Sequence, residues 1–134
     1  MSDDFTADVD LYVRSTLAKK AFDLVVLDVR ELTSVADAFI LCSGRSNRQV
    51  TAIAESIQQQ LKRRKKKPLS VEGAREGHWV LLDYGEVVIH VFYEPVRRFY
   101  DLEGLWVDAR RITTASMAAA PQADSASQPG IDEE

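Results

Sequence analysis

Two strands predicted at residues 79–83 and 87–92 are apolar on both faces, and this feature restricts the fold more than any other. Side chains along a strand point alternately to the two faces of a sheet, and a face that meets water is polar at every second position. One face carries Val80, Leu82, Val87, Ile89 and Val91, and the other carries Trp79, Leu81, Val88, His90 and Phe92. Both faces must therefore be covered.

The sequence leaves two interpretations of these apolar side chains open. In the first, every one of these side chains belongs to the core of the chain itself. In the second, part of one face is an open docking patch with Trp79 at its centre. Large aromatic side chains are common anchors of protein interfaces, and an exposed apolar patch usually has a partner.

The rest of the chain predicts the elements that could supply the cover. A stripe at helical spacing predicts a helix at residues 7–22, and short apolar runs predict strands at 24–29, 38–42 and 69–73. Ser46 and Gln49 form a capping box ahead of an amphipathic helix that stops before Pro68, and Pro95 opens a last helix. The order α-β-β-α-β-β-β-α indicates an α/β fold, with a mixed sheet of about five strands and flanking helices.

The chain divides into a folded domain at residues 1–111 and a predicted disordered acidic tail at 112–134. The tail is rich in Ala, Ser, Pro and Gln, and it cannot bury enough apolar surface to offset its ordering entropy. It holds four of the 21 acidic residues and none of the 17 basic ones, so the domain is neutral overall. A neutral domain argues against binding nucleic acid over its whole surface.

Other totals exclude whole classes of protein. A single cysteine rules out an intrachain disulfide, and no apolar run approaches the roughly 20 residues that span a bilayer. The N-terminus is acidic and has no apolar segment of the signal-peptide kind. We therefore expect a cytoplasmic protein with no membrane contact.

The residues predict no catalytic centre, metal site or cofactor. His90 lies within a strand and His78 beside a loop, and neither has metal-ligand spacing with Cys42. A Cys42 nucleophile with His90 as its base stays a minor alternative, because a cysteine within a strand is usually inert packing. The turn at residues 44–46 precedes a helix and could hold an anion, as many helix starts can.

A basic run follows the amphipathic helix, and two interpretations of it are open. It can be a solvated helix end, where positive charge suits the helix dipole, or a contact for RNA phosphate. The run consists of Lys62, Arg63, Arg64, Lys65, Lys66 and Lys67.

Three blocks of sequence resemble the ribosomal silencing factor, or Iojap-like, family. The first is Asp37–Gly44 with Ser46–Val50 after it, and the second is Val71–Gly73 with Trp79–Phe92. The third is Arg97–Trp106, and together the likeness covers about residues 7–107 in order. The acidic tail and the long basic run lie outside the family pattern.

The resemblance implies a nucleotidyltransferase-like fold and a non-enzymatic function. Family members bind large-subunit ribosomal protein fourteen, keep the ribosomal subunits apart and so repress translation, and they tend to form homodimers. Contact with nearby ribosomal RNA would be incidental. Carried onto this chain, the partner-binding surface is expected at Trp79, Leu81, His90, Phe92, Tyr100 and Asp101, with Trp79 as the anchor.

Two rival functions remain. An active nucleotidyltransferase needs a Gly-Ser motif followed closely by Asp-x-Asp or Asp-x-Glu to hold metal and triphosphate, and no such acidic pair follows residues 44–46. An RNA-binding module would use residues 62–67 and would bind free RNA with steep salt dependence.

Overall fold

The structure, a computed structural model, describes residues 2–119. Its elements are α1 (Ser2–Thr16), β1 (Phe22–Asp28), β2 (Ala38–Gly44), α2 (Asn47–Arg63), β3 (Ser70–Glu72), β4 (Trp79–Asp83), β5 (Val87–Tyr93), α3 (Glu94–Tyr100), α4 (Leu102–Leu105), β6 (Arg110–Ile112) and α5 (Ala115–Ala119). Within these residues, no helix is both long and apolar enough to cross a membrane.

The strands form one mixed sheet in the order β3-β4-β5-β2-β1-β6. The central pair β2 and β5 is parallel, and the other neighbours are antiparallel. The predicted mixed α/β architecture is confirmed, but the predicted number of strands is too small. The missed strand β6 has only three residues, two of them arginine, so it carries no alternating pattern.

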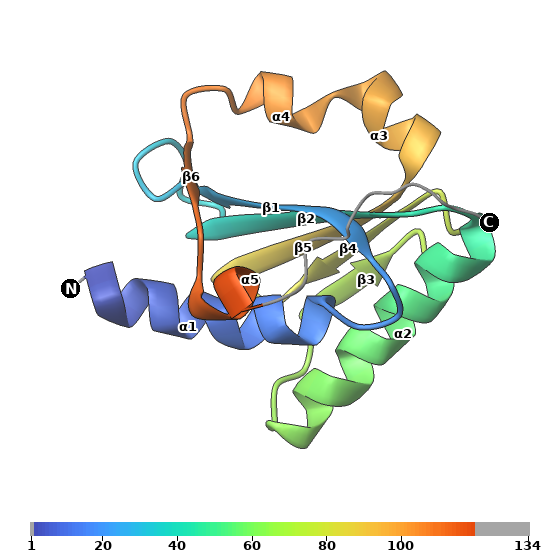
Figure 1. The fold of residues 1–134 in the computed structure, drawn as a ribbon, viewed down its shortest axis with the longest axis horizontal. Coiled ribbons are helices and arrows are strands. Elements are labelled where there is room, and N and C mark those ends of the chain that lie inside the picture. Colours follow the sequence, from blue (N-terminus) through green and yellow to red (C-terminus); the bar gives the residue numbers. More distant parts are fainter. Residues whose placement is uncertain (1, 120–134) are drawn as a thin grey trace.

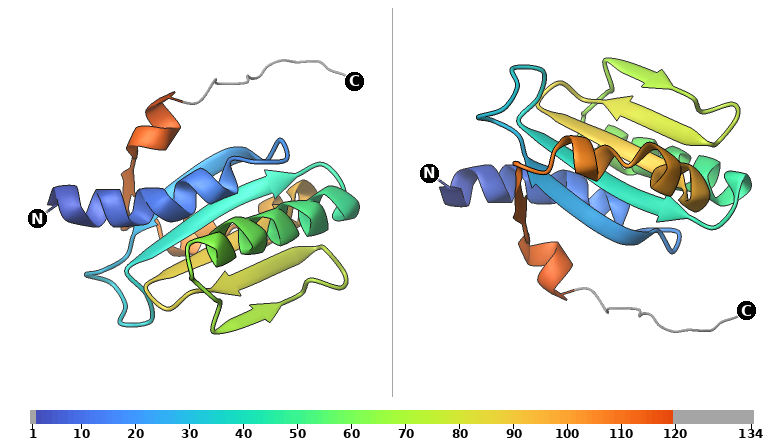
Figure 2. Two further views of the ribbon diagram at one scale, coloured as in Figure 1. Left: turned by 90° about the horizontal axis from the view of Figure 1, so that it is seen from below. Right: turned by 90° about the horizontal axis from the view of Figure 1, so that it is seen from above.

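Helices cover both faces of the sheet. Figure 1 shows α1, α2 and α5 below it and α3 and α4 above it, and the two views in Figure 2 show α1 and α2 lying across one face and α3 and α4 across the other. The lower core includes Val80, Leu82 and Ile89, and the upper core includes Val88 and Phe92. The predicted alternation along the hairpin is therefore confirmed, and so is the cover on both faces.

The first helix ends earlier than predicted, at Thr16 instead of residue 22. Lys19 and Lys20 have φ angles of 59° and 61°, in the left-handed region, so the chain leaves the helix in a tight turn before β1. The amide of Gln49 holds this turn, because its Nε2 donates to the carbonyl oxygens of Lys19 and Lys20 at 3.0 Å and 3.2 Å. The turn thus depends on a side chain from α2.

The capping box at the start of α2 forms largely as predicted. The Ser46 hydroxyl accepts from the backbone N–H of Gln49 at 3.1 Å, and Oε1 of Gln49 accepts from the N–H of Arg45. The helix ends at Arg63, before the end of the basic run, because Lys65 takes a left-handed conformation with φ of 63°. The basic run is therefore part helix and part turn.

The last predicted helix is divided into α3 and α4. Asp101 has a left-handed backbone with φ of 48°, which ends α3, and its side chain caps α4 by accepting from the N–H of Gly104. An Asp tolerates this conformation better than most residues. The chain therefore changes direction directly after Tyr100.

The folded unit extends beyond Arg111, so the predicted start of the disordered tail is too early. β6 pairs with β1, and α5 packs on α1. The carboxylate of Asp10 accepts from the N–H and the hydroxyl of Ser116 at 2.8 Å and 2.7 Å. This polar contact compensates for the scarcity of large apolar residues in the segment. The rest of the predicted tail, residues 120–134, lies outside the described residues.

Gln49→Ala should lower the free energy of unfolding by about 1–2 kcal/mol, because the substitution leaves the Arg45 N–H and the Lys19 and Lys20 carbonyls without this partner. Urea denaturation measures the change. Gln59→Ala, at an exposed position of the same helix, is the matched control and should cost less than about 0.5 kcal/mol. Equal effects of the two substitutions would contradict this role of Gln49.

Candidate functional site

An aromatic cluster joins the hairpin to α3 on the upper face of the sheet. Trp79 stacks on Phe92 with ring centroids 4.9 Å apart, and it meets the ring of Tyr100 at 5.1 Å. Its indole Nε1–H donates to Nδ1 of His90 at 3.1 Å. Leu81 is the cross-strand neighbour of His90. The structure thus brings Trp79, His90, Phe92 and Tyr100 together, with Leu81 beside them and Asp101 next in the chain.

Exposure separates these six predicted residues into two groups. His90 is 5% exposed and Phe92 is 0% exposed, so the prediction that both form part of a contact surface is wrong. The reason is that α3 and α4 cover this face of the sheet. Trp79 and Leu81 are half-buried, and Tyr100 and Asp101 are exposed. The buried pair supports Trp79 from beneath.

The exposed apolar side chains of this region lie on α3, on α4 and in the turn directly after α4, and not on the sheet. Phe99, Tyr100, Leu105 and Val107 are 80%, 53%, 75% and 76% exposed, and we call them the α3–α4 surface. Sequence reasoning missed Phe99, Leu105 and Val107 as candidates. A signal existed, because residues 99–107 hold more large apolar side chains than one short helix can bury.

A buried guanidinium holds the α3–α4 surface on the sheet. Nη1 of Arg97 donates to the carbonyl oxygen of Asp23 at 2.7 Å and to the hydroxyl of Ser43 at 2.8 Å. Its Nε and Nη2 donate to the two carboxylate oxygens of Glu103 at 3.2 Å and 2.9 Å. These bonds lower the pKa of Glu103, so the carboxylate stays charged. Arg97 therefore ties α3 to α4 across the bend at Asp101 and ties both to β1 and β2.

Trp106 supplies the second anchor of this segment. Its ring meets Phe39 edge-on at 5.1 Å, and it is half-buried between the exposed side chains of Leu105 and Val107. Leu102 packs into the same upper core. The α3–α4 surface is therefore fixed at both ends.

The basic run lies on the opposite face of the sheet from the α3–α4 surface. Lys62 and Arg63 occupy the last turn of α2, and Arg64 is its C-cap. Lys66 lies over the ring of Tyr12, with its Nζ 5.7 Å from the ring centroid. The other five cations of the run, Lys62, Arg63, Arg64, Lys65 and Lys67, are exposed. The two groups of predicted binding residues are thus separated by the thickness of the sheet.

The structure does not bring the catalytic alternative together. Cys42 packs in the lower core, whereas the ring of His90 contacts Phe39 on the upper face. Burial raises the pKa of the Cys42 thiol to about 12, so the nucleophilic thiolate is scarce at neutral pH. Within residues 2–119, no group of three or more His, Cys, Asp or Glu side chains is placed to hold a metal ion.

Arg97→Met should cost about 3 kcal/mol of stability, because it leaves Glu103 and the Asp23 carbonyl without their donor. The control Arg98→Met removes the neighbouring pair with Glu94, whose arginine side chain is 68% exposed, and should cost less than about 1 kcal/mol. Chemical denaturation measures both variants. A loss of stability below about 1 kcal/mol in Arg97→Met would show that the hydrogen bonds of Arg97 are dispensable.

Burial lowers the pKa of His90 from 6.5 to about 4. Between these values the unfolded chain binds a proton on this residue and the folded protein does not. The free energy of unfolding should therefore fall as the pH decreases below about 6.5, by about 3 kcal/mol in total, and this loss levels off below pH 4.

The check on this linkage is urea denaturation of His90→Phe and the unsubstituted protein at pH 7 and pH 4.5. The difference between their unfolding free energies should change by about 2–3 kcal/mol in favour of the variant at the lower pH. Parallel pH profiles would rule out a neutral, buried His90.

Comparisons with known proteins agree with the resemblance in the sequence. Residues 2–133 match the family described as "Ribosomal silencing factor during starvation". The chain is 44% identical to the ribosomal silencing factor RsfS of Bacillus subtilis over 91 residues, which are 68% of this chain and 77% of that protein. It is 30% identical over 102 residues to the Mus musculus protein named "Mitochondrial assembly of ribosomal large subunit protein 1", covering 74% of this chain and 45% of that protein.

The fold agrees as well. A crystal structure of a protein from Chromobacterium violaceum superposes with a TM-score of 0.72 at 39% sequence identity, covering 83% of this chain and 92% of that one. With sequence and fold in agreement, the family predicted from the sequence is confirmed: the chain belongs to the ribosomal silencing factors.

Proposed function

We propose that this protein docks through the α3–α4 surface and Trp79 onto the large ribosomal subunit, at large-subunit ribosomal protein fourteen, and blocks joining of the small subunit. Membership of the silencing-factor family supports a ribosomal role. The name of the related mouse protein refers to the large ribosomal subunit. The observation that carries the proposal is the exposed apolar α3–α4 surface on a rigid base.

Exposure and rigidity together make this surface suited to docking. Phe99 and Leu105 are 80% and 75% exposed, although apolar side chains of this size usually avoid water. Arg97 fixes the backbone beneath them, so little conformational entropy is lost on binding. A preorganised apolar surface is the kind on which a few residues supply most of the binding energy.

Each predicted residue takes a defined place in this proposal. Tyr100 and the exposed edge of Trp79 contact the partner, with Leu81 beside them. Asp101 lies at the polar rim, although its carboxylate already caps α4. His90 and Phe92 act from beneath, by holding the indole of Trp79 in place.

The mechanism is steric and makes or breaks no covalent bond. A large subunit that carries the docked protein cannot accept the small subunit at the same surface. Free and occupied large subunits are in equilibrium, so the fraction able to join falls as the protein concentration exceeds its Kd. A non-enzymatic role needs no cofactor. Self-association as a homodimer, which we also propose, would compete with docking if the copies meet through the α3–α4 surface.

The test is sedimentation of the protein with separated ribosomal subunits on a sucrose gradient, with Leu105→Ser and Leu69→Ser compared. The two leucines are 75% and 74% exposed, but Leu69 precedes the edge strand β3, away from α3 and α4. Leu105→Ser should weaken co-sedimentation with the large subunit about tenfold, as loss of about 1.4 kcal/mol predicts. Leu69→Ser should bind and block joining like the unsubstituted protein.

Trp79→Ala provides a second probe, and it should reduce binding because Tyr100 loses the ring against which it packs. Equal losses in the two leucine variants would refute the choice of surface. If the unsubstituted protein stayed at the top of the gradient and the subunits joined normally, the silencing role itself would be refuted.

A further inference from the structure

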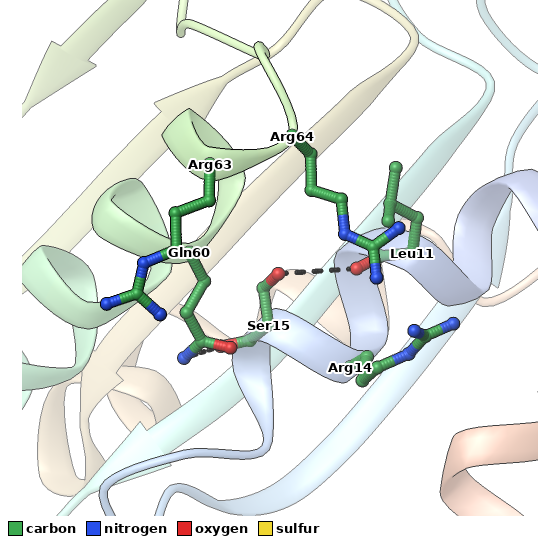
Figure 3. Close-up of a pocket in the computed structure, with 6 residues that line it drawn as sticks. All are labelled: Leu11, Arg14, Ser15, Gln60, Arg63 and Arg64. Atoms are coloured by element: carbon green, nitrogen blue, oxygen red, sulfur yellow. Dashed lines mark hydrogen bonds between the residues drawn. The ribbon is translucent and has the colours of Figure 1, made fainter.

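A second candidate site lies between α1 and the C-terminal end of α2. It is a depression of about 200 Å³ lined by Leu11, Arg14, Ser15, Gln60, Arg63 and Arg64. Figure 3 shows the three arginine side chains spread around Gln60 and Ser15. At roughly 30 Å³ for each water molecule, the volume admits a phosphate group with part of its hydration shell.

The charge of this depression is strongly positive. Three of its six lining residues are arginines, and none is acidic. Within residues 2–119, Arg63 and Arg64 form no ion pair with an acidic side chain. Arg14 has one long contact of 3.7 Å with Asp10, and its side chain is 57% exposed. The guanidinium groups are therefore available to an anion from solvent.

The end of α2 opposes anion binding only weakly. A helix C-terminus carries about half a negative charge from its free carbonyl groups. Here the N–H of Arg64 and the N–H of Lys66 donate to the carbonyl oxygen of Leu61, and the N–H of Lys65 donates to that of Lys62. The carbonyl charge is thus partly compensated, and three full positive charges outweigh the remainder.

Gln60 and Ser15 link the two helices by a hydrogen bond. Nε2 of Gln60 donates to the carbonyl oxygen of Ser15 at 3.5 Å and to the hydroxyl of Ser56 at 3.0 Å. The hydroxyl of Ser15 donates back within α1, to the carbonyl oxygen of Leu11. The depression is therefore lined by both helices, with Arg14 from α1 and with Arg63 and Arg64 from the C-terminal end of α2.

We propose that this depression, the α1–α2 pocket, binds a backbone phosphate of RNA. Guanidinium groups donate paired hydrogen bonds that match phosphate oxygens, and three guanidinium groups line the pocket. The lysines that follow Arg64 extend the positive charge along the chain, which suits a polymer with many phosphates. The choice of RNA over other phosphates rests on the proposed ribosomal function.

An acidic protein segment fits the pocket less well. Protein interfaces rely on apolar anchors surrounded by a polar rim, and the only large apolar side chain that lines this pocket is Leu11. The helices α1 and α2, which line the pocket, lie on the face of the sheet opposite α3 and α4 (Figure 2). RNA bound at α1 and α2 would therefore leave the docking surface free, and both sites could be occupied at once.

The test compares Gln60→Glu with Gln59→Glu for binding of a fluorescein-labelled 20-nucleotide RNA hairpin, followed by fluorescence anisotropy between 50 mM and 200 mM salt. The two substitutions make the same change of charge at neighbouring positions of α2, but only Gln60 lines the pocket. Gln60→Glu should weaken binding about tenfold and lower the slope of log K against log salt by about 1. Gln59→Glu should change binding less than about threefold.

Arg64→Lys is a second variant for the case in which Gln60→Glu fails to fold. It keeps the positive charge at an exposed position, so it should fold like the unsubstituted protein. It should weaken binding about threefold, since a lysine cannot donate a paired hydrogen bond to phosphate. Equal binding by the two glutamate variants, or unchanged binding by Arg64→Lys, would overturn the pocket. Competition by a ten-residue polyglutamate peptide as strong as that by unlabelled RNA would also overturn it.

This test is independent of the docking test. Leu105→Ser should bind the RNA hairpin like the unsubstituted protein, because the two sites lie on opposite faces. If the protein bound RNA through the pocket but did not sediment with the large subunit, only the proposed function would fail. If it sedimented normally but Gln60→Glu bound RNA as tightly as Gln59→Glu, only the pocket would fail.

Discussion

The hydrogen bonds of the buried Arg97 guanidinium decide how the upper half of this molecule is arranged. One side chain reaches the Asp23 carbonyl, the hydroxyl of Ser43 and both oxygens of Glu103, so β1, β2, α3 and α4 share a single donor. A buried charge with so many partners tolerates little displacement, because each lost bond leaves a polar group without compensation. The bend at Asp101 and the position of Tyr100 follow from it.

This constraint explains why large apolar side chains remain exposed on and just after α3 and α4. Leu102 and Trp106 fill the space above the sheet, so Phe99, Leu105 and Val107 have nowhere to pack within the domain. Such a surface lowers solubility unless it has a partner. Membership of the silencing-factor family supports a ribosomal partner. The hydrogen bonds of Arg97 supply the rigidity that the proposed docking requires.

The two faces of the sheet carry surfaces of different chemistry. The upper face presents an apolar surface on α3 and α4, and the lower face presents cations at the junction of α1 and α2. The net charge of residues 1–111 is zero, so the net charge gives no sign of this asymmetry. The separation matters physically because an arginine-rich site binds anions more weakly as the salt concentration rises. The affinity of an apolar contact changes little over the same range. The two surfaces should therefore respond differently to ionic strength.

Local patterns were sufficient to predict much of this fold. The alternation at residues 79–83 and 87–92 predicted a sheet covered on both faces, and Ser46 with Gln49 predicted the start of α2. These features depend on near neighbours in the chain, so they are visible in a single sequence. The short strand β6 and the helix α5 were missed because they are held by distant partners, β1 and the carboxylate of Asp10.

The sequence by itself determined the α/β class, the two-sided core, the family and the segments from which a docking surface could come. Only the tertiary structure decided which of those side chains reach solvent: His90 and Phe92 do not, whereas Phe99 and Leu105 do. It also decided that Arg97 is buried and that Arg14 lines the same depression as Arg63 and Arg64. The physical reason is that exposure depends on which elements pack over a face, and residues far apart in the chain settle that packing.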